Sequence, residues 1–298
     1  MANSHRLDHK SFVVPPGKKI RLKDYDPAYT GGINDKAAAK DALLEDVSEL
    51  AKMQDIFWAS KDYAMVIILQ ALDAAGKDST IEHVMSGVNP QGVNVYSFKA
   101  PTEEERLHHF LWRPMRVLPA AGTIAIFNRS YYEEVLVVRV HPEFLESQRL
   151  SVNARKKGLD YVWQSRYDEI NTLEKSLAKE NTLVLKFFLN VSRKEQRKRF
   201  LERLENPEKN WKFSVGDLQE RAHWDEYQQA YEDMLGATST EAAPWYVIPA
   251  DKKWFTRACV ADIITTRLRE LGLTYPKVPE KEMAALAEAK QQLAAETD

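Results

Sequence analysis

Five short apolar segments, rich in β-branched residues, are spread along the chain and predict β-strands. The first, MVIILQAL at 65–72, is a continuous apolar run of the kind found in a strand buried on both faces. Similar runs lie at 93–98, 122–127, 182–189 and 245–250. Because segments with helical periodicity separate these runs, the sequence predicts an α/β fold with helices on both faces of a parallel sheet.

The helical segments and the polar ends complete the predicted organisation. Helices are expected at 36–59, 78–87, 102–118, 130–140, 155–179, 192–204, 217–236 and 253–272. Residues 1–35 contain Pro and Gly breakers and predict an irregular arm, whereas 273–298 predict a surface helix or a frayed tail. Since no internal repeat or long linker interrupts the pattern, we expect one domain over 1–298 with a helical insertion near 205–235.

The segment ALDAAGKDST at 71–80 follows the first apolar run and precedes a helical pattern. A P-loop has the pattern G-x-x-x-x-G-K-[ST], and Gly76 and Lys77 match its last glycine and its lysine. Backbone N–H groups at a helix N-terminus bind phosphate oxygens, and a lysine adds formal charge between phosphates. The candidate phosphate-binding residues of this loop are Ala74, Ala75, Gly76, Lys77, Asp78 and Ser79.

Two positions depart from the P-loop pattern. Ala71 stands where the first glycine is usual, so the turn must keep a negative φ there or adopt an unusual backbone. Asp78 replaces the Ser or Thr that normally touches Mg²⁺, and Asp73 adds a second acid, so metal or basic groups must compensate. The alternative interpretation is an ordinary strand–turn–helix with an Asp cap and a surface Lys77.

A second group of polar residues, Asn128, Arg129 and Ser130, ends the apolar run at 122–127. In P-loop enzymes an acid at such a strand end helps to hold Mg²⁺, and Asn128 offers a neutral oxygen instead. Arg129 can bind phosphate with two parallel hydrogen bonds. Alternatively, Asn128 and Ser130 cap the next helix and Arg129 pairs with a surface acid.

Basic residues gather in the helix expected at 192–204 and in the segment ENPEKNWKFS at 205–214. A charge run is most often a solvated helix face. The other interpretation is a basic lid, near 205–235, that closes over transferring phosphates. Further candidates for phosphate contacts are Lys99, Arg139, Arg193, Lys209 and Lys212.

Composition narrows the classes of function. Lys plus Arg number 42 and Asp plus Glu 44, a net charge of -2, which argues against general nucleic-acid binding. The single cysteine, Cys259, excludes a disulfide within the chain. The first ten residues lack the apolar core of a secretory signal, and no uncharged run approaches the ~20 residues that span a bilayer, so a cytoplasmic location without membrane contact is expected.

Taken together, the motifs resemble the polyphosphate kinase 2 family. They are LDAAGKDST (72–80), FNRSYYE (127–133), NPEKNWKFS (206–214), W-x-x-Y-x-x-A-Y-E (224–232) and APWYVIPAD (243–251), in the family's order, and the resemblance runs from about residue 40 to 272. It implies a three-layer P-loop kinase fold like that of thymidylate kinase with a helical lid, Mg²⁺ (or Mn²⁺) dependence and polyphosphate as a substrate. Family members commonly form dimers or tetramers.

The resemblance also assigns roles by motif position. Asp73, Lys77 and Arg129 match catalytic positions, and Asp73 and Asn128 match the metal-binding positions. The nucleotide-binding candidates are Asn128, Arg129, Tyr132 and Glu133. Many members have an Asp at the position of Asn128 and Trp-Tyr-Asn in place of 131–133. The departures resemble the branch called class III, which accepts both AMP and ADP.

The sequence therefore predicts reversible phosphoryl transfer from inorganic polyphosphate to AMP and ADP, with ATP as the final product. One alternative is an ATP-dependent nucleoside-monophosphate kinase, which Asp73 and Asp78 in the loop disfavour. A second alternative is a non-catalytic P-loop binding module, which the presence of Lys77 and Arg129 disfavours.

Overall fold

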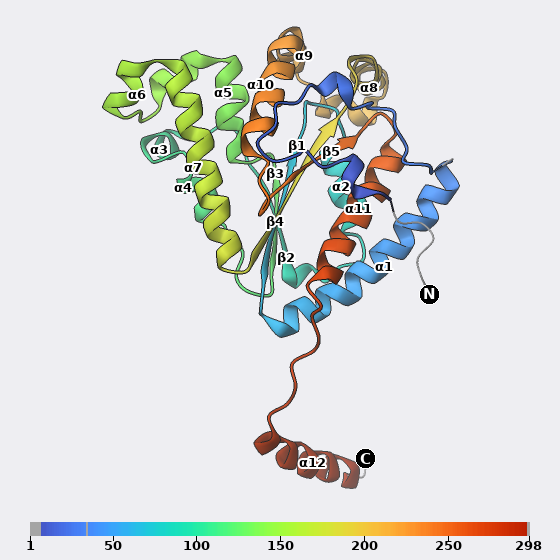
Figure 1. Ribbon diagram of the computed structural model, residues 1–298. Helices are drawn as coiled ribbons and strands as arrows, with labels where there is room; N and C mark the ends of the chain where they lie inside the picture. The colour runs from blue at the N-terminus through green and yellow to red at the C-terminus, as the bar shows by residue number, and fades with distance from the viewer. Residues whose placement is uncertain (1–6, 34, 297–298) are drawn as a thin grey trace.

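The core of the molecule is a five-stranded parallel sheet. The computed structural model describes residues 7–33 and 35–296. The strands are β1 (Ala64–Gln70), β2 (Val93–Ser97), β3 (Ile124–Asn128), β4 (Thr182–Asn190) and β5 (Trp245–Pro249). Their order is β2-β3-β1-β4-β5, so all five predicted strands are present and β1 is central (Figure 1).

Helices cover both faces of the sheet, as the α/β pattern predicted. Along β1, Met65, Ile67 and Leu69 pack into one core cluster with helices α1 (Lys36–Ser60) and α11 (Lys253–Glu270). The intervening residues Val66 and Ile68 pack into the opposite cluster, which includes α7 (Leu159–Lys179) and α10 (Trp224–Thr238). Because alternate residues of a strand face opposite sides, β1 is buried on both faces and the three-layer α/β/α fold is confirmed.

One strand differs from its prediction. The run at 93–98 was expected to resemble the buried strands, but β2 pairs only with β3 and its residues are half-buried or exposed. It lies at the edge of the sheet, where fewer helices cover it. Strands β1 and β5, by contrast, are buried along their whole length.

Several predicted helices are divided in the structure. The pieces are α3 (Glu103–Leu107) and α4 (Trp112–Met115), the 3₁₀ helix η4 (Tyr131–Val135) and α5 (Val137–Val140), α6 (Val152–Lys157) before α7, and α9 (Val215–Ala222) before α10. Gly158 separates α6 from α7 with a positive φ of 86°. The remaining α-helices are α2 (Lys77–Val84), α8 (Arg193–Glu205) and α12 (Glu280–Ala295) in the described part of the chain, and the other 3₁₀ helices are η1 (His9–Ser11), η2 (Leu22–Asp24), η3 (Pro90–Gly92), η5 (Pro142–Ser147) and η6 (Pro207–Lys212).

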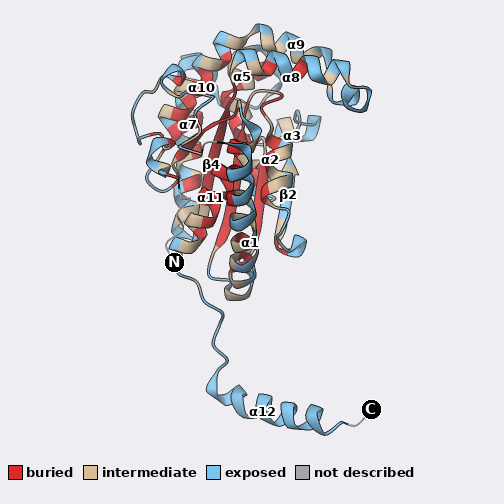
Figure 2. Ribbon diagram, turned by 90° about the vertical axis from the view of Figure 1, so that its right-hand side faces the viewer, coloured by how far each residue is buried: buried red, intermediate tan, exposed pale blue. Residues whose placement is uncertain are grey.

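The two ends of the chain behave differently. From residue 7 onward the predicted arm packs on the sheet, where Val14 N donates to Trp245 O (2.9 Å) and Val247 N donates to Phe12 O (2.7 Å) beside β5. The tail forms the exposed helix α12, which stands apart from the body of the protein (Figure 2). The start of the arm before residue 7 and the end of the tail after 296 lie outside the described residues.

Candidate functional site

The carboxyl ends of β1 and β3 lie side by side and bring together the two motifs predicted from the sequence. Leu69 of β1 is in register with Asn128 of β3, and Arg129 N donates to Leu69 O (3.1 Å). This is the edge of a parallel sheet at which ligands bind in open α/β folds. A cavity of about 960 Å³ opens there, and both the loop after β1 and the residues after β3 line it.

The loop after β1 has the shape of a phosphate-binding loop. Gly76 precedes α2 with a φ of 114°, a conformation that favours glycine. Ala71 does not adopt a positive φ, in agreement with the first of the two alternatives, and the left-handed position of the loop is Ala74, whose φ is 61°. Asp73, Ala74, Gly76, Lys77, Asp78 and Ser79 line the cavity, whereas Ala75 is buried behind it.

Lys77 is buried at the base of this loop. Its Nζ donates to the carbonyl oxygen of Ala71 at 2.9 Å. Burial, followed by the charge of Arg129, lowers the pKa of Lys77 to about 8, although Asp73 and Glu133 oppose this shift. The lysine therefore loses its proton at a lower pH than an exposed lysine would, and bound phosphate would favour its charged form.

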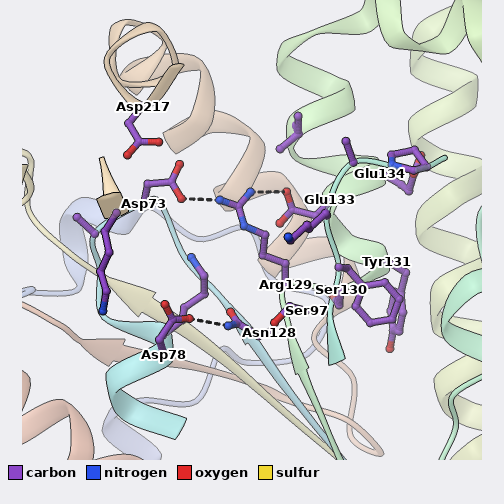
Figure 3. A pocket seen from close by; sticks show the side chains of 18 of the residues that line it. Asp73, Asp78, Ser97, Asn128, Arg129, Ser130, Tyr131, Glu133, Glu134 and Asp217 are labelled. Carbon is purple, nitrogen blue, oxygen red and sulfur yellow. Dashed lines mark hydrogen bonds and ion pairs between the residues drawn. The ribbon is translucent and has the colours of Figure 1, made fainter. Parts of the chain in front are cut away.

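Arg129 is held between two acids at the centre of the site (Figure 3). Its Nη2 donates to Asp73 Oδ1 at 2.5 Å, and its Nη1 lies 3.4 Å from Glu133 Oε2. Glu133, then Asp73, raises the pKa of Arg129 against the effect of burial, so the guanidinium stays charged. Its φ of 61° is left-handed, which is uncommon for a non-glycine residue. The two acids and the backbone fix the direction in which the guanidinium points.

A second contact joins the loop to the end of β3. Asn128 Nδ2 donates to Asp78 Oδ1 at 2.6 Å, so each strand end supplies one partner (Figure 3). The two predicted metal ligands, Asp73 and Asn128, therefore each have a protein partner. Within the described residues, no group of three or more His, Cys, Asp or Glu side chains is placed to hold a metal ion.

Arg199 of α8 supports the loop from behind, a role that the sequence did not indicate. Its Nη1 donates to the carbonyl oxygens of Ala74 (3.0 Å) and Ala75 (2.7 Å). Its Nη2 donates to those of Ala250 (2.6 Å) and Asp251 (3.0 Å), after β5. The side chain is only 3% exposed. Part of the basic run on α8 is thus not a solvated face but a buried support for the phosphate loop.

Asp217, at the start of α9, is a second site residue that the sequence analysis did not identify. Burial, followed by the charge of Asp73, raises the pKa of the Asp217 carboxyl, and the two side chains face each other in Figure 3. Acids are common in the first turn of a helix, so its position alone carried no signal.

Basic residues from α8, η6 and the start of α11 line the same part of the cavity as the phosphate loop. They are Arg199, Arg203, Lys209, Lys212 and Lys253. Lys209, Lys212 and Lys99, predicted to contact phosphate, thus line the same cavity as the loop.

Three of the predicted binding residues do not line the cavity of the phosphate loop. Tyr132 was expected to bind nucleotide, but it is fully buried and its hydroxyl donates to Glu174 Oε1 (2.7 Å), because η4 turns it into the core. Glu174 also accepts a bond from the buried Lys186 (2.6 Å). Arg139 binds the Tyr167 hydroxyl and the Asp233 carboxylate, and Arg193 stacks over Trp224 outside the cavity of the phosphate loop.

Comparisons with known proteins agree with this geometry. The family model "Polyphosphate kinase 2 (PPK2)" matches residues 33–273. The chain is 44% identical to the ADP-polyphosphate phosphotransferase of Rhodopseudomonas palustris, over 97% of this chain and 99% of the relative. It is 46% identical to the AMP/ADP-polyphosphate phosphotransferase of Meiothermus ruber, over 90% and 96% of the two chains.

A solved structure gives the same result. The crystal structure of polyphosphate kinase 2 from Arthrobacter aurescens superposes with a TM-score of 0.83 at 39% identity, covering 93% of this chain and 95% of that chain. In the described ranges, 7–33 and 35–296, no helix is long and apolar enough to cross a membrane.

Proposed function

Because this chain belongs to the polyphosphate kinase 2 family, we propose that it transfers phosphoryl groups reversibly between inorganic polyphosphate and the adenosine nucleotides AMP and ADP. The observation that carries the proposal is the position of Lys77 and Arg129 at adjacent strand ends, above one cavity lined by basic side chains. The relatives named above are phosphotransferases of polyphosphate, and the family match covers most of the chain.

The reaction is an in-line displacement at phosphorus. An oxygen of the nucleotide's terminal phosphate attacks the terminal phosphorus of polyphosphate, and the bond from that phosphorus to the bridging oxygen breaks. A phosphate nucleophile is already anionic near neutral pH, so a strong general base is unnecessary. Positioning and charge neutralisation then supply most of the rate enhancement.

The residues of this chain divide these tasks. Lys77 exchanges its bond with the Ala71 carbonyl for a phosphate oxygen at the base of the loop. Arg129, held by Asp73 and Glu133, presents a fixed planar donor to the charge that spreads over the transferring group. The N-terminus of α2 adds backbone N–H groups aimed at the same phosphates.

Mg²⁺, with Mn²⁺ as a substitute, is part of the proposal, and the residues present fit it. Burial, then the charge of the nearby Asp73, raises the pKa of Asp217. Asp73 pairs with Arg129 and Asp217 Oδ2 lies 3.6 Å from Arg203 Nη1, so a cation would join two carboxylates that each have one arginine partner. Mg²⁺ usually takes one or two carboxylates together with substrate phosphates and waters, so a complete protein cage is not required. Asp73 and Asp217, with the amide oxygen of Asn128, would hold the ion. When bound, it neutralises phosphate charge.

The residues at and after the end of β3 support the use of both AMP and ADP as phosphoryl acceptors. Asn128 is neutral, and Glu133 is engaged with Arg129 rather than fixed to one acceptor position. Since AMP and ADP differ in length by one phosphate, a site without a rigid carboxylate at 128 suits both. We expect AMP to be converted through ADP to ATP.

The test is product analysis with purified protein, polyphosphate and Mg²⁺, offering AMP, ADP, GMP or GDP in turn. The proposal requires ADP and ATP to accumulate from AMP in a time course, and this activity to depend on Mg²⁺. An enzyme that phosphorylates AMP only with ATP as donor would be a nucleoside-monophosphate kinase. No turnover with any donor would favour a binding module.

A cytoplasmic location and assembly into dimers or tetramers belong to the same proposal. The resemblance of the motifs supports the assembly, whereas the location rests on the sequence analysis alone. Light scattering on the purified protein measures the assembly, and a monomer at working concentrations would contradict it.

A further inference from the structure

A fully buried ion pair lies behind the segment that follows β3. Lys186 of β4 and Glu174 of α7 are both 0% exposed, and Lys186 Nζ donates to Glu174 Oε2 at 2.6 Å. Neither residue lines the cavity of the phosphate loop. A charged pair in the core costs desolvation free energy that a well-packed apolar pair would avoid. Stability is therefore a weak explanation for this pair, and its other contacts point to a different role.

The pair holds the two tyrosines with which the 3₁₀ helix η4 begins. The hydroxyls of Tyr131 and Tyr132 both donate to Glu174 Oε1, at 2.8 and 2.7 Å. Lys186 Nζ also donates to the Tyr132 hydroxyl (3.0 Å) and to the Thr238 carbonyl oxygen (2.6 Å), so all three of its hydrogens have acceptors. Burial, followed by the charge of Glu174, raises the pKa of both tyrosines, which keeps their hydroxyls protonated. The network thus joins the start of η4 to β4, α7 and the end of α10.

The backbone turn that directs Arg129 lies immediately before these tyrosines (Figure 3). Arg129 has its left-handed φ of 61°, and the next residue, Ser130, accepts a bond at Oγ from Tyr132 N (3.2 Å). Glu133, which lies 3.4 Å from the Arg129 guanidinium, belongs to the same 3₁₀ helix. A left-handed non-glycine residue persists only where the surrounding structure determines it. The buried network therefore anchors the segment that holds both this turn and one of the two acids beside Arg129.

We propose that Glu174 and Lys186 are positioning residues for Arg129, which they act on through the two tyrosines at the start of η4. This inference rests on the proposed function, because it assumes that Arg129 binds the transferring phosphoryl group. It goes further by assigning a role in the reaction to two core residues that neither the motifs nor the cavity indicated. A misplacement of about 1 Å in a reacting group can cost about 100-fold in rate, so a buried support of this kind affects turnover.

The alternative is that the pair contributes only to the packing of the core. Both roles predict a loss of stability when one partner is removed, so the single variants do not distinguish them. Removing both charges together does, because an apolar pair restores much of the stability but not the hydrogen bonds to the tyrosine hydroxyls. Packing alone then predicts wild-type kcat in the folded double variant, whereas positioning predicts a lowered kcat.

The experiment compares the double variant Glu174→Leu/Lys186→Met with wild type in steady-state kinetics, with polyphosphate and AMP or ADP, and in amide hydrogen exchange. We expect kcat to fall by about ten- to a hundredfold, with smaller changes in KM for either substrate. Amides at 129–135 should exchange faster, because the tyrosine hydroxyls no longer hold that segment. The matched control is Leu50→Ala in α1, which leaves a cavity in the core cluster on the opposite face of the sheet and should lower stability without either effect.

A double-mutant cycle tests whether the pair acts through Arg129. In an Arg129→Lys background, the same two substitutions should lower kcat by less than about threefold, because the group that they position is gone. Tyr132→Phe gives an independent measurement if the double variant does not fold. It keeps the ring and the ion pair, removes the hydroxyl that bonds to Glu174 and Lys186, and should lower kcat and speed exchange at 129–135.

Three results would overturn the inference. They are wild-type kcat in a folded double variant, an equal fall in kcat with and without Arg129→Lys, and unchanged exchange at 129–135 in both the double variant and Tyr132→Phe. A wild type that transfers no phosphate from polyphosphate would instead refute the proposed function. The exchange measurement needs no substrate, so it still decides whether the pair fixes the segment that carries Arg129.

Discussion

Replacing Arg199 with alanine should destabilise the protein and disorder its phosphate loop. The guanidinium donates to four backbone carbonyls, two in the loop and two after β5, and its Nε donates to Glu195 Oε1 (3.0 Å); the residue is only 3% exposed. A hydrogen bond from a charged group contributes about 1.5–3 kcal/mol, and removing one partner of a buried charged contact costs about 3–5 kcal/mol in total. Since these bonds share one side chain, we expect a total loss of about 3–5 kcal/mol in the free energy of unfolding, not the sum over the separate hydrogen bonds.

The measurement is the free energy of unfolding from urea denaturation, together with the melting temperature. At roughly 2 °C per kcal/mol for a chain of this size, the melting temperature should fall by about 6–10 °C. The matched control is Arg197→Ala, which removes an exposed arginine from the same helix and should change stability by no more than about 0.5 kcal/mol.

Activity gives the second half of this test. If Arg199 positions the loop, Arg199→Lys should lower kcat even where it restores much of the stability, because one ammonium group cannot reach carbonyls on both segments. Arg199→Ala with the wild-type unfolding midpoint would refute the reasoning. So would Arg199→Lys with wild-type kcat, since the loop would then hold its shape without the planar donor.

Three further predictions concern neighbouring residues. Lys77→Ala should lower turnover by about two orders of magnitude. In the wild type, kcat/KM for polyphosphate should fall as the pH rises through about 8, because Lys77, with its lowered pKa, loses its charge there. Lys77→Arg should move this fall to higher pH, and an unchanged pH profile would contradict the assignment. Arg129→Lys should lower kcat although charge is kept, which steady-state kinetics checks against wild-type values. Lys186→Met should cost about 3–5 kcal/mol in urea denaturation, because it leaves the buried Glu174 carboxylate with hydrogen bonds from tyrosine hydroxyls but without its cation, and adding Glu174→Leu should restore much of the stability.

The parts of the site that the sequence predicted are those that local chemistry determines. Gly76 and Lys77 stand in a pattern whose function depends on consecutive backbone groups, so their spacing was enough. Asn128 and Arg129 could be placed beside the loop because parallel strands bring their carboxyl ends to one edge. The fold followed from the same alternation of strands and helices.

The site residues whose roles were not predicted from the sequence are those whose side-chain direction depends on tertiary packing. A run of six basic residues on α8 does not indicate that Arg199 is the one that is buried, since the packing of α8 against the loop decides this. Tyr132 turned into the core because the segment after β3 is a 3₁₀ helix, whose turn is tighter than that of an α-helix. Asp217 lies far from Asp73 in the sequence, and only the fold brings these two carboxylates together.

The packing of residues 12–14 against β5 bears on how the chain folds during its synthesis. Phe12 and Val14 bond to residues 245–247, so this segment can reach its partner only after the more than 200 residues between them have been made. Until then the outer edge of β5 does not exist, and afterwards it is unpaired until the arm docks. An unpaired strand edge can recruit another chain. Docking of the arm is therefore the step that covers the β5 edge, and its timing sets how long that edge of each new molecule is open to aggregation.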